Sequence, residues 1–143
     1  AQTPMDSSNT LYNGLIEVMF YDTDAGGVVH NIAYLRFVEY ARTKLAAQLG
    51  HDIKTCAEEN IFAVVVRTEI DYIKPAKLGE SLTITSTLSG ADRVRFYITT
   101  EIFRPTDGKK IIRCYQTLAL LKMPEGKVLP APKDWVGFFS PKE

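Results

Sequence analysis

The sequence has few cysteines and no long apolar run, and both absences narrow the class of protein. Its two cysteines, Cys56 and Cys114, lie far apart and match no metal-binding or redox spacing. They are typical of free thiols in a reducing compartment rather than of a disulfide framework. No segment approaches the roughly 18 consecutive apolar residues of a membrane span, and the first ten residues lack the basic and apolar regions of a signal peptide. We therefore expect a cytoplasmic protein without a membrane span.

Net charge is a second property that the sequence lacks. Lysine plus arginine and aspartate plus glutamate each number 17 in 143 residues. A chain near neutrality has no strong field to attract a nucleic acid or an anionic membrane, so we expect no nucleic-acid partner. With 45% hydrophobic residues, the chain has the apolar content for one core and one globular domain. Any partner must therefore be inferred from a local site.

The longest periodic segment, residues 32–49, has the pattern of an amphipathic helix. Apolar side chains at intervals of three and four residues form one stripe: Tyr34, Phe37, Val38, Ala41, Leu45 and Leu49. Asn31 is a suitable N-cap, and Gly50 stands where a left-handed residue often ends a helix. More apolar surface lies outside the stripe, at Ile32, Leu35, Ala46 and Ala47. We therefore expect a helix that is buried on much of its circumference.

The remaining elements are predicted to be strands, because apolar and polar side chains alternate with a period of two. The first strand is expected at 15–21 and a connector with one helical turn at 51–60; four strands follow at 64–73, 82–88, 94–102 and 111–123. Tight turns between the last three predict an antiparallel meander. This order indicates an α+β fold in which one curved sheet covers one helix. The segment 124–143, with Trp135, is expected to serve as surface packing or an interface.

A short loop whose residue types suit catalysis or ligand binding precedes the helix. Asp22 and Asp24 stand just before Gly26-Gly27, and the helix begins a few residues later. An acidic group and the positive end of a helix dipole therefore face one small space. The glycine pair permits positive φ and a close approach of the backbone to a ligand.

These residues resemble the signature of the hot-dog-fold acyl-CoA thioesterases of the 4-hydroxybenzoyl-CoA thioesterase and tol-pal-associated type. The loop at 22–29, DTDAGGVV, carries the resemblance, and the helix continues it with Tyr34, Glu39, Ala41 and Arg42. Matches also occur at 71–76, 79–80, 126–128 and Pro130. The resemblance covers 14–132, with 1–13 as a flexible N-terminal lead-in and 133–143 as a C-terminal tail. It implies one long central helix wrapped by a curved antiparallel sheet of about five strands.

The resemblance implies hydrolysis of a thioester to a free acid and coenzyme A, without a metal or other cofactor. Asp24 takes the position of the catalytic carboxylate, as a nucleophile or as a general base. A carboxylate beside a helix N-terminus is held ionised by the dipole and by nearby N–H donors, which suits both roles. The backbone N–H of Asn31 takes the position of the oxyanion donor, in agreement with the free N–H groups of a first helical turn. Asp22 is expected to hold the loop or the helix start, with a paired acid–base role as the alternative.

Two further side chains, His30 and Glu39, are candidates for assisting catalysis. His30 suits a general base or substrate contact, but also a helix cap. The sequence departs at His30-Asn31 from the commonest form of the motif, which leaves side-chain roles there open. Glu39 is expected to orient the site or a water molecule, although Glu39 and Arg42 also suit an ion pair on the helix surface.

Candidate substrate-binding residues form a larger set: Gly26, Gly27, Val28, Tyr34, Arg93 and Arg95. Coenzyme A carries phosphates, so a basic rim is required, and Lys74, Lys77 and Arg104 are further candidates for it. Phe37, Phe62, Phe96 and Tyr72 are expected in the core. The resemblance also implies a homo-oligomer, as a dimer or a dimer of dimers (a homotetramer), with active sites shared across the interface.

The alternatives within the enzyme class are an acyl-carrier-protein thioesterase and a hydroxynaphthoyl-CoA hydrolase. A hot-dog dehydratase fits less well, because its usual site pairs a histidine with an acid. From another class, a non-catalytic acyl-CoA binding module would use the same groove. The intact DTDAGGVV loop favours catalysis over binding alone.

Overall fold

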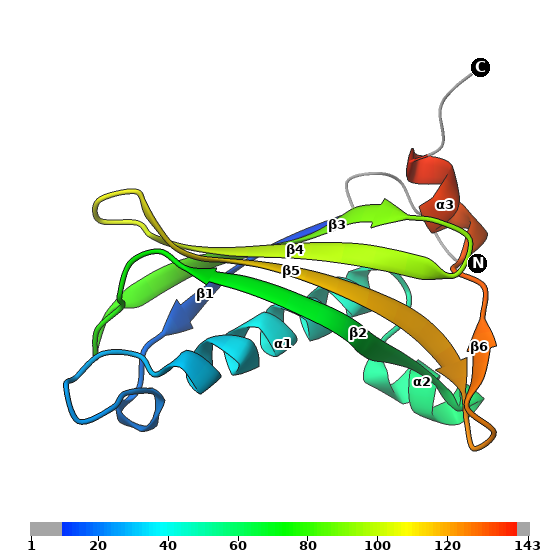
Figure 1. Ribbon diagram of the computed structural model, residues 1–143, viewed down its shortest axis with the longest axis horizontal. Coiled ribbons are helices and arrows are strands. Elements are labelled where there is room, and N and C mark those ends of the chain that lie inside the picture. The colour runs from blue at the N-terminus through cyan, green and yellow to red at the C-terminus, as the bar shows by residue number, and fades with distance from the viewer. Residues whose placement is uncertain (1–9, 140–143) are drawn as a thin grey trace.

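The structure, a computed structural model, describes residues 10–139. Its long helix is preceded by a strand and a 3-10 turn and is followed by a short helix, a run of strands and a last short helix (Figure 1). In chain order the elements are β1 (Leu11–Glu17), η2 (Phe20–Asp22), α1 (Asn31–Gln48), α2 (Ile53–Glu59), β2 (Ile61–Tyr72), β3 (Ser81–Ala91), β4 (Arg95–Arg104), β5 (Lys109–Lys122), β6 (Lys127–Leu129) and α3 (Lys133–Phe139).

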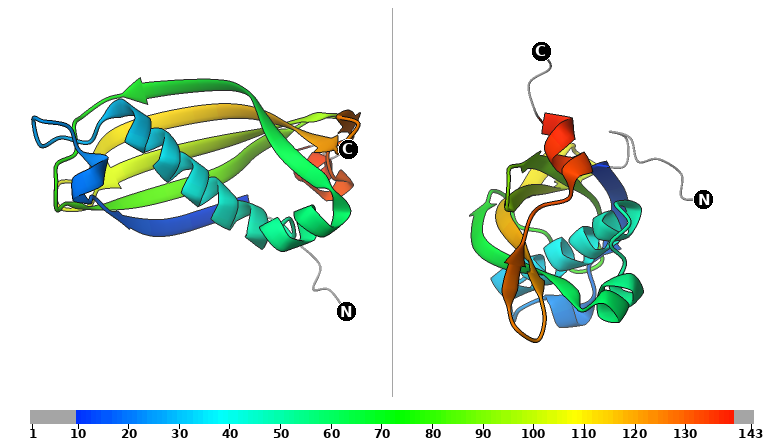
Figure 2. Two further views of the ribbon diagram at one scale, coloured as in Figure 1. Left: turned by 90° about the horizontal axis from the view of Figure 1, so that it is seen from below. Right: turned by 90° about the vertical axis from the view of Figure 1, so that its right-hand side faces the viewer.

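The strands form one antiparallel sheet that curves around α1. Its order is β1-β3-β4-β5-β2, and β6 pairs with the last three residues of β5. The three strands β3, β4 and β5 follow one another in space as in the sequence, so the predicted meander is confirmed. Figure 2 shows α1 lying diagonally across the concave face. One central helix wrapped by five main strands is the expected α+β hot-dog arrangement, with β6 as an addition.

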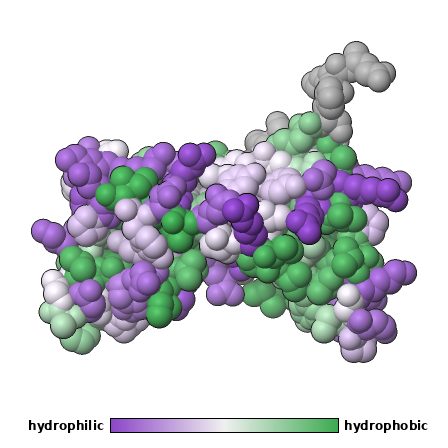
Figure 3. Space-filling model, in the orientation of Figure 1, coloured by the Kyte–Doolittle hydropathy of each residue, from purple (hydrophilic) through white to green (hydrophobic). Residues whose placement is uncertain are grey.

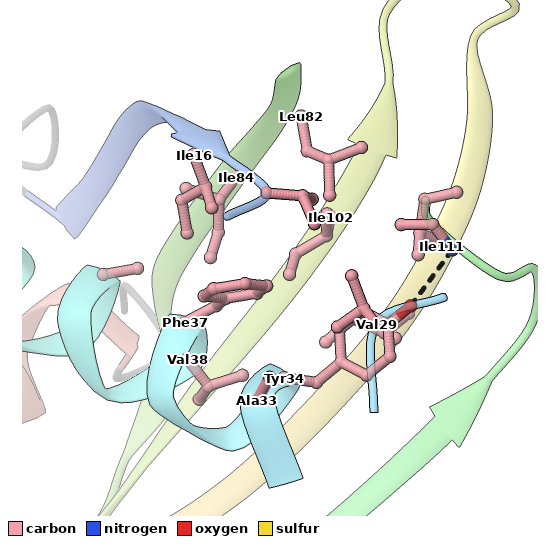
Figure 4. Close-up of a cluster of buried hydrophobic side chains, with 14 of the residues drawn as sticks. Ile16, Val29, Ala33, Tyr34, Phe37, Val38, Leu82, Ile84, Ile102 and Ile111 are labelled. Carbon is pink, nitrogen blue, oxygen red and sulfur yellow. Dashed lines mark hydrogen bonds between the residues drawn. The ribbon is translucent and has the colours of Figure 1, made fainter. Parts of the chain in front are cut away.

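The predicted apolar stripe of α1 forms the core. All six of its residues are buried, each with at most 8% of its surface exposed. Phe37 points from the helix toward the sheet residues Ile84 and Ile102, and Tyr34 points toward Ile111 (Figure 4). A second cluster continues the core toward the C-terminal end of α1, around Leu45, Leu49, Leu88, Phe96, Leu118 and Trp135. The 3.6-residue period therefore identified the face that packs on the sheet.

The other faces of α1 differ from the expectation. Ile32 is 63% exposed and Leu35 is 40% exposed, so burial on much of the circumference is wrong for a single chain. The helix packs against β1, β3 and β4, and β2 stays largely exposed along its length. Phe62 and Tyr72, at the two ends of β2, are accordingly exposed rather than part of the core. One chain alone thus leaves apolar surface uncovered beside α1.

Several boundaries also differ from those expected. The first strand lies at Leu11–Glu17 rather than 15–21, because Phe20–Asp22 turns away as η2. Residues 11–13 of the expected lead-in pair with β3, whereas residues 1–9 lie outside the described part. The connector contains the two-turn helix α2, which Asp52 caps by accepting a hydrogen bond from the Thr55 amide.

The C-terminal segment contributes to the core through α3. Trp135 is only 3% exposed, and its ring lies 4.9 Å from that of Phe96 and 5.1 Å from that of His51. The sequence predicts surface packing or an interface for this segment. The structure instead buries its largest aromatic side chain between the sheet and the end of α1.

Replacing a fully buried residue of α1 tests this account of the core. Leu45 is 0% exposed, so Leu45→Ala is expected to lower the free energy of unfolding by about 2–5 kcal/mol, through lost burial and a residual cavity. The same change at Leu15, which is 73% exposed, should alter the free energy by no more than about 0.5 kcal/mol. Urea denaturation measures both. Equal losses in the two variants would contradict the proposed core.

Candidate active site

The loop before α1 is a tight hairpin. Thr23 and Val29 pair across it, and the Asp24 amide donates to the Val28 carbonyl oxygen at 2.9 Å. At the tip, the Gly27 amide donates back to the Asp24 carbonyl oxygen at 3.0 Å. Gly27 has a φ of +77°, the left-handed region in which a side chain is strained. The expected use of glycine for positive φ is thus confirmed at Gly27.

A second loop holds this hairpin in place. The Val29 amide donates to the Ala76 carbonyl oxygen at 2.8 Å, and the Leu78 amide donates to the Gly27 carbonyl oxygen at 3.1 Å. Ala76 is fully buried. The hairpin is therefore fixed against the segment that joins β2 to β3, and the loop has little freedom to move independently of the sheet.

Asp22 has a structural place at the base of the hairpin. Its side chain is 4% exposed; Oδ2 accepts from the Met19 amide at 2.9 Å, and Oδ1 accepts from the Arg36 guanidinium at 3.1 Å. Its carbonyl oxygen accepts from the His30 amide at 3.0 Å. These contacts tie η2, the hairpin and α1 together, which is the supporting role expected of this residue.

Asp24, in contrast, is exposed. Its Oδ1 accepts from the Gly26 amide at 2.8 Å, which orients the carboxylate. In the described structure no other donor is bonded to this carboxylate, so Oδ2 is accessible to a reactant. A Cβ at position 26 would lie 3.3 Å from Oδ1, a tight contact that glycine avoids. An oriented and accessible carboxylate can act as a nucleophile or as a base.

The first turn of α1 offers hydrogen-bond donors next to this loop. His30 is the N-cap, since its Nδ1 accepts from the Ala33 amide at 3.1 Å. The expectation that Asn31 caps the helix is therefore wrong, and Asn31 is the first helical residue. Within residues 10–139 the amides of Asn31 and Ile32 are bonded to no acceptor. These two N–H groups can receive an oxyanion at the positive end of the helix dipole.

A hollow of about 280 Å³ lies beside this helix start. It is lined by Val29, Asn31, Tyr34, Tyr72, Ile73, Lys74 and Pro75. The rings of Tyr34 and Tyr72 lie 5.7 Å apart, and the Tyr72 hydroxyl donates to the Asn31 carbonyl oxygen at 3.4 Å. Burial raises the pKa of Tyr34, whose hydroxyl accepts from the Ala76 amide at 3.2 Å. The expectation that Tyr72 lies in the core is therefore wrong, and the match of residues 71–76 to the thioesterase signature is the sequence signal that points to this position.

Of the candidate catalytic and substrate-binding residues, Asn31 and Tyr34 line this hollow, and three others lie far from it. Glu39 is exposed two turns along α1, about 12 Å from Asn31 at 1.5 Å per residue. Arg93 and Arg95 lie at the start of β4, where the Arg93 carbonyl oxygen accepts from the Ala131 amide. The end of β4 near the loop is about 30 Å away. Within one chain these arginines are therefore remote from Asp24.

Basic side chains gather at another hollow, of about 740 Å³, that shares Lys74 and Pro75 with the first. Arg104 has a structural role there, because its guanidinium is occupied by three hydrogen bonds. It donates to Glu80 at 2.6 Å, to the Pro75 carbonyl oxygen at 2.6 Å and to Asp107 at 3.2 Å. The hydrogen bond to Glu80 raises the pKa of Arg104. The other cations of this wall are Lys74, Lys77 and Lys109, whose ammonium groups form no ion pair with the described residues.

No metal site is found in the described part of the chain, where no three histidine, cysteine, aspartate or glutamate side chains are grouped. Cys56 and Cys114 are both free thiols. Burial raises the pKa of Cys114 to about 11, so it stays protonated near neutral pH. None of the described helices has both the length and the apolar character needed to cross a membrane.

The chain is similar to known proteins both in sequence and in structure. The sequence model of the thioesterase-like superfamily matches residues 18–139. The acyl-CoA thioesterase YbgC of Haemophilus influenzae is 43% identical over 75 residues, which are 52% of this chain and 55% of that protein. The 1,4-dihydroxy-2-naphthoyl-CoA hydrolase of Thermosynechococcus vestitus is 29% identical over 116 residues, which are 80% of this chain and 79% of the other.

Among solved structures, a probable thioesterase from Bartonella henselae matches with a TM-score of 0.78 and 27% identity, over 85% of this chain and 99% of that one. The chain spans only 55–61% of the length of the YbgC proteins that it matches. The superfamily match, by contrast, extends over most of the chain, from the residue that follows β1 to the end of α3. This chain therefore belongs to the thioesterase-like superfamily.

Proposed function

We propose that the protein hydrolyses acyl-CoA thioesters to a free acid and coenzyme A. The observation that carries this proposal is that the hairpin holding the exposed, oriented Asp24 carboxylate leads directly into α1, whose first two amides are bonded to no acceptor in the described chain. A relative named as an acyl-CoA thioesterase supports the choice of substrate. The two free thiols suit a reducing compartment, which supports a cytoplasmic location.

The geometry supports a simple course for the reaction. The thioester oxygen accepts hydrogen bonds from the Asn31 and Ile32 amides, which stabilise its negative charge as the carbonyl carbon is attacked. In one route an Asp24 oxygen bonds to that carbon, the carbon–sulfur bond breaks, and water hydrolyses the resulting anhydride. In the other, Asp24 takes a proton from water, whose oxygen attacks directly. The thiolate of coenzyme A leaves in both routes and takes up a proton.

The supporting side chains have more limited roles in this scheme. Nδ1 of His30 is occupied by the Ala33 amide, so only Nε2 is available for a substrate contact. Glu39 is too far along α1 to touch the reacting carbon, and we propose that it acts on the acyl group instead. Gly26 and Gly27 keep the approach to Asp24 clear of side chains, and Val28 and Tyr34 support the hollow.

A hydroxynaphthoyl-CoA hydrolase is the second candidate. The relative from Thermosynechococcus vestitus aligns with 80% of this chain. The hollow at the helix start is flanked by Tyr34 and Tyr72, whose rings suit the packing of an aromatic acyl group. A panel of aliphatic and aromatic acyl-CoAs separates the two candidates through the ratio of their kcat/KM values.

Replacing Asp24 tests the assigned chemistry. Asp24→Asn is expected to lower kcat/KM for acyl-CoA hydrolysis by about 100-fold or more, because the amide neither attacks nor accepts a proton. Glu125→Gln, at an exposed carboxylate in the turn between β5 and β6, should leave the rate unchanged. Thermal unfolding verifies that both variants fold. Full activity of Asp24→Asn would refute the assignment.

The lysines of the larger hollow are proposed to bind the phosphates of coenzyme A. Lys77→Ala is expected to raise KM for acyl-CoA about three- to fivefold, as for the loss of one exposed charge pair. KM for the matching thioester of N-acetylcysteamine, which has no phosphate, should not change. Lys127→Ala, on β6, is the control. An equal effect on both thioesters would mean that Lys77 does not bind phosphate.

We also propose that two chains associate along β2. Its outer edge is unpaired in the described chain, and exposed apolar side chains lie on it at Val65 and Val66 and beside it at Ile32 and Leu35. Pairing between two β2 strands would extend the sheet and place the two α1 helices side by side. Arg93 and Arg95, which are remote from Asp24 of their own chain, would then be candidates for the partner's site. A dimer of dimers is the larger assembly proposed.

Sedimentation tests the association. A chain of 16.0 kDa is expected to sediment with at least twice this mass, and Leu35→Glu should shift it to the monomer with loss of activity, because a charge would be buried between helices. Leu15→Glu, at an exposed position of β1, should leave the dimer intact. An active wild-type monomer would rule out a shared site.

A further inference from the structure

A third cavity lies on the same side of α1 but away from Asp24. Its volume is about 310 Å³, and it is lined by residues of α1, α2, α3 and the strands β2, β4 and β5. Its walls are mostly apolar, with Ala46, Leu49, Phe62, Leu118 and Trp135 among them. Figure 3 shows apolar side chains gathered on the surface over α2 and the first half of β2. The space is of the size and character of a small-molecule site.

One cation, Arg42, interrupts these apolar walls. Arg42 is half-buried, and its Nη1 donates to Oε1 of Gln116 at 2.6 Å. Nε2 of Gln116 then donates to the Thr68 hydroxyl at 3.1 Å, so the chain of hydrogen bonds joins α1 to β5 and β2. A guanidinium has five N–H donors and stays charged in proteins. The structure provides Arg42 with a single neutral acceptor among the described residues.

The other ionisable groups of the cavity do not neutralise this charge. Glu39, three residues earlier on α1, is exposed and forms no ion pair with Arg42 within residues 10–139, although its charge acts to raise the pKa of Arg42. Desolvation is the larger effect and lowers that pKa. Burial also lowers the pKa of His51, which is therefore neutral at pH 7. Burial and nearby acids raise the pKa of the Cys56 thiol, which is likewise neutral.

A half-buried cation with unused donors favours an anion as its partner. Burying a charge without an opposite charge is costly, and an entering carboxylate would accept two parallel hydrogen bonds from the guanidinium. The rest of the ligand must be apolar to match the walls. The cavity is about twice the roughly 150 Å³ of an apolar cavity that takes up benzene, so a ligand of roughly 12 non-hydrogen atoms fits it.

The cavity is aligned with the start of α1. Asn31, Leu35, Glu39, Arg42 and Ala46 follow one another at spacings of three and four residues, so they share one face of the helix. Arg42 is about 16 Å along the axis from Asn31. The hollow at the helix start and this cavity therefore lie along one side of the helix, with Leu35 between them.

We propose that this cavity binds an apolar chain ending in a carboxylate, with Arg42 as the residue that holds the carboxylate. Such a ligand has two sources. One is a free carboxylic acid, and the other is the acyl part of a thioester that carries a second carboxylate at its far end. The first needs no assumption about catalysis, whereas the second rests on the proposed function.

Calorimetry with decanoate and decan-1-ol tests the binding site directly. Decanoate is expected to bind the wild-type protein at least tenfold more tightly than the alcohol, because a charge-assisted hydrogen bond is added. Arg42→Met, which keeps an apolar side chain of similar length, should remove this difference by weakening decanoate alone. Ala46→Phe, which fills the cavity, should weaken both ligands.

A further variant separates binding from a loss of structure. Gln116→Met removes the neutral acceptor of Arg42 and leaves the charge in place. It is expected to bind decanoate as tightly as the wild type or more tightly, which a damaged core would not do. Equal affinities of the wild type for decanoate and decan-1-ol would overturn the proposal, as would no binding of either or an unchanged decanoate affinity in Arg42→Met.

Turnover distinguishes the second source of the carboxylate. If the acyl group enters the cavity, the wild type should have a lower KM for the CoA monothioester of decanedioic acid than for decanoyl-CoA. Arg42→Met should abolish this preference. Binding of decanoate without hydrolysis of any thioester would retain the site and remove the proposed function. Hydrolysis of acyl-CoA with neither selective binding of decanoate nor a preference for the diacid thioester would support the proposed function and overturn the carboxylate site.

Discussion

The buried carboxylate of Asp22 is the constraint on which the candidate site depends. It accepts hydrogen bonds from the Met19 amide and from Arg36, while the carbonyl of the same residue accepts from the His30 amide. One residue thereby fixes the turn before the hairpin, the side of α1 and the residue that caps it. Because buried charges must be paired, this arrangement has few alternatives. Asp24, two residues later, keeps an exposed carboxylate while Asp22 makes the contacts that hold the structure.

The helix serves both the core and the site. Its buried stripe packs on β1, β3 and β4, and its first turn provides two amides beside the hairpin that are bonded to no acceptor in the part of the chain that the structure describes. Since the helix is fixed along its length by packing, the amides are held in position before a substrate binds, which is the condition for effective stabilisation of an oxyanion. Stability and preorganisation of the site thus come from the same contacts.

The sequence identified what depends on local period and spacing. The stripe from Tyr34 to Leu49, the meander and the loop with Asp24 all follow from patterns within a few residues. The sequence predicts Asn31 as the N-cap, one residue too late, because His30 and Asn31 are both suitable caps. The hydrogen bond from the Ala33 amide to Nδ1 of His30 decides between them. Tyr72 was placed in the core because its strand alternates, but whether a face is covered depends on the position of α1 over the sheet. Arg93 and Arg95 lie at the start of β4, whose opposite end is near the candidate site. The length of β4 therefore separates these arginines from Asp24 of the same chain.

The direction of the Arg42 side chain is likewise not predicted by its spacing in the sequence, and this direction decides what the residue can bind. Its spacing from Glu39 is that of an ion pair on a helix surface, yet its guanidinium turns inward to Gln116, 74 residues away in the sequence. An exposed pair would contribute little free energy and no selectivity. In the binding mode that we propose, the same half-buried cation discriminates between neutral and anionic chains, because partial desolvation strengthens its interaction with an anion. If the helix carries the reacting carbonyl at its first turn and this cation three turns later, the distance between them sets which acyl groups can occupy both positions at once.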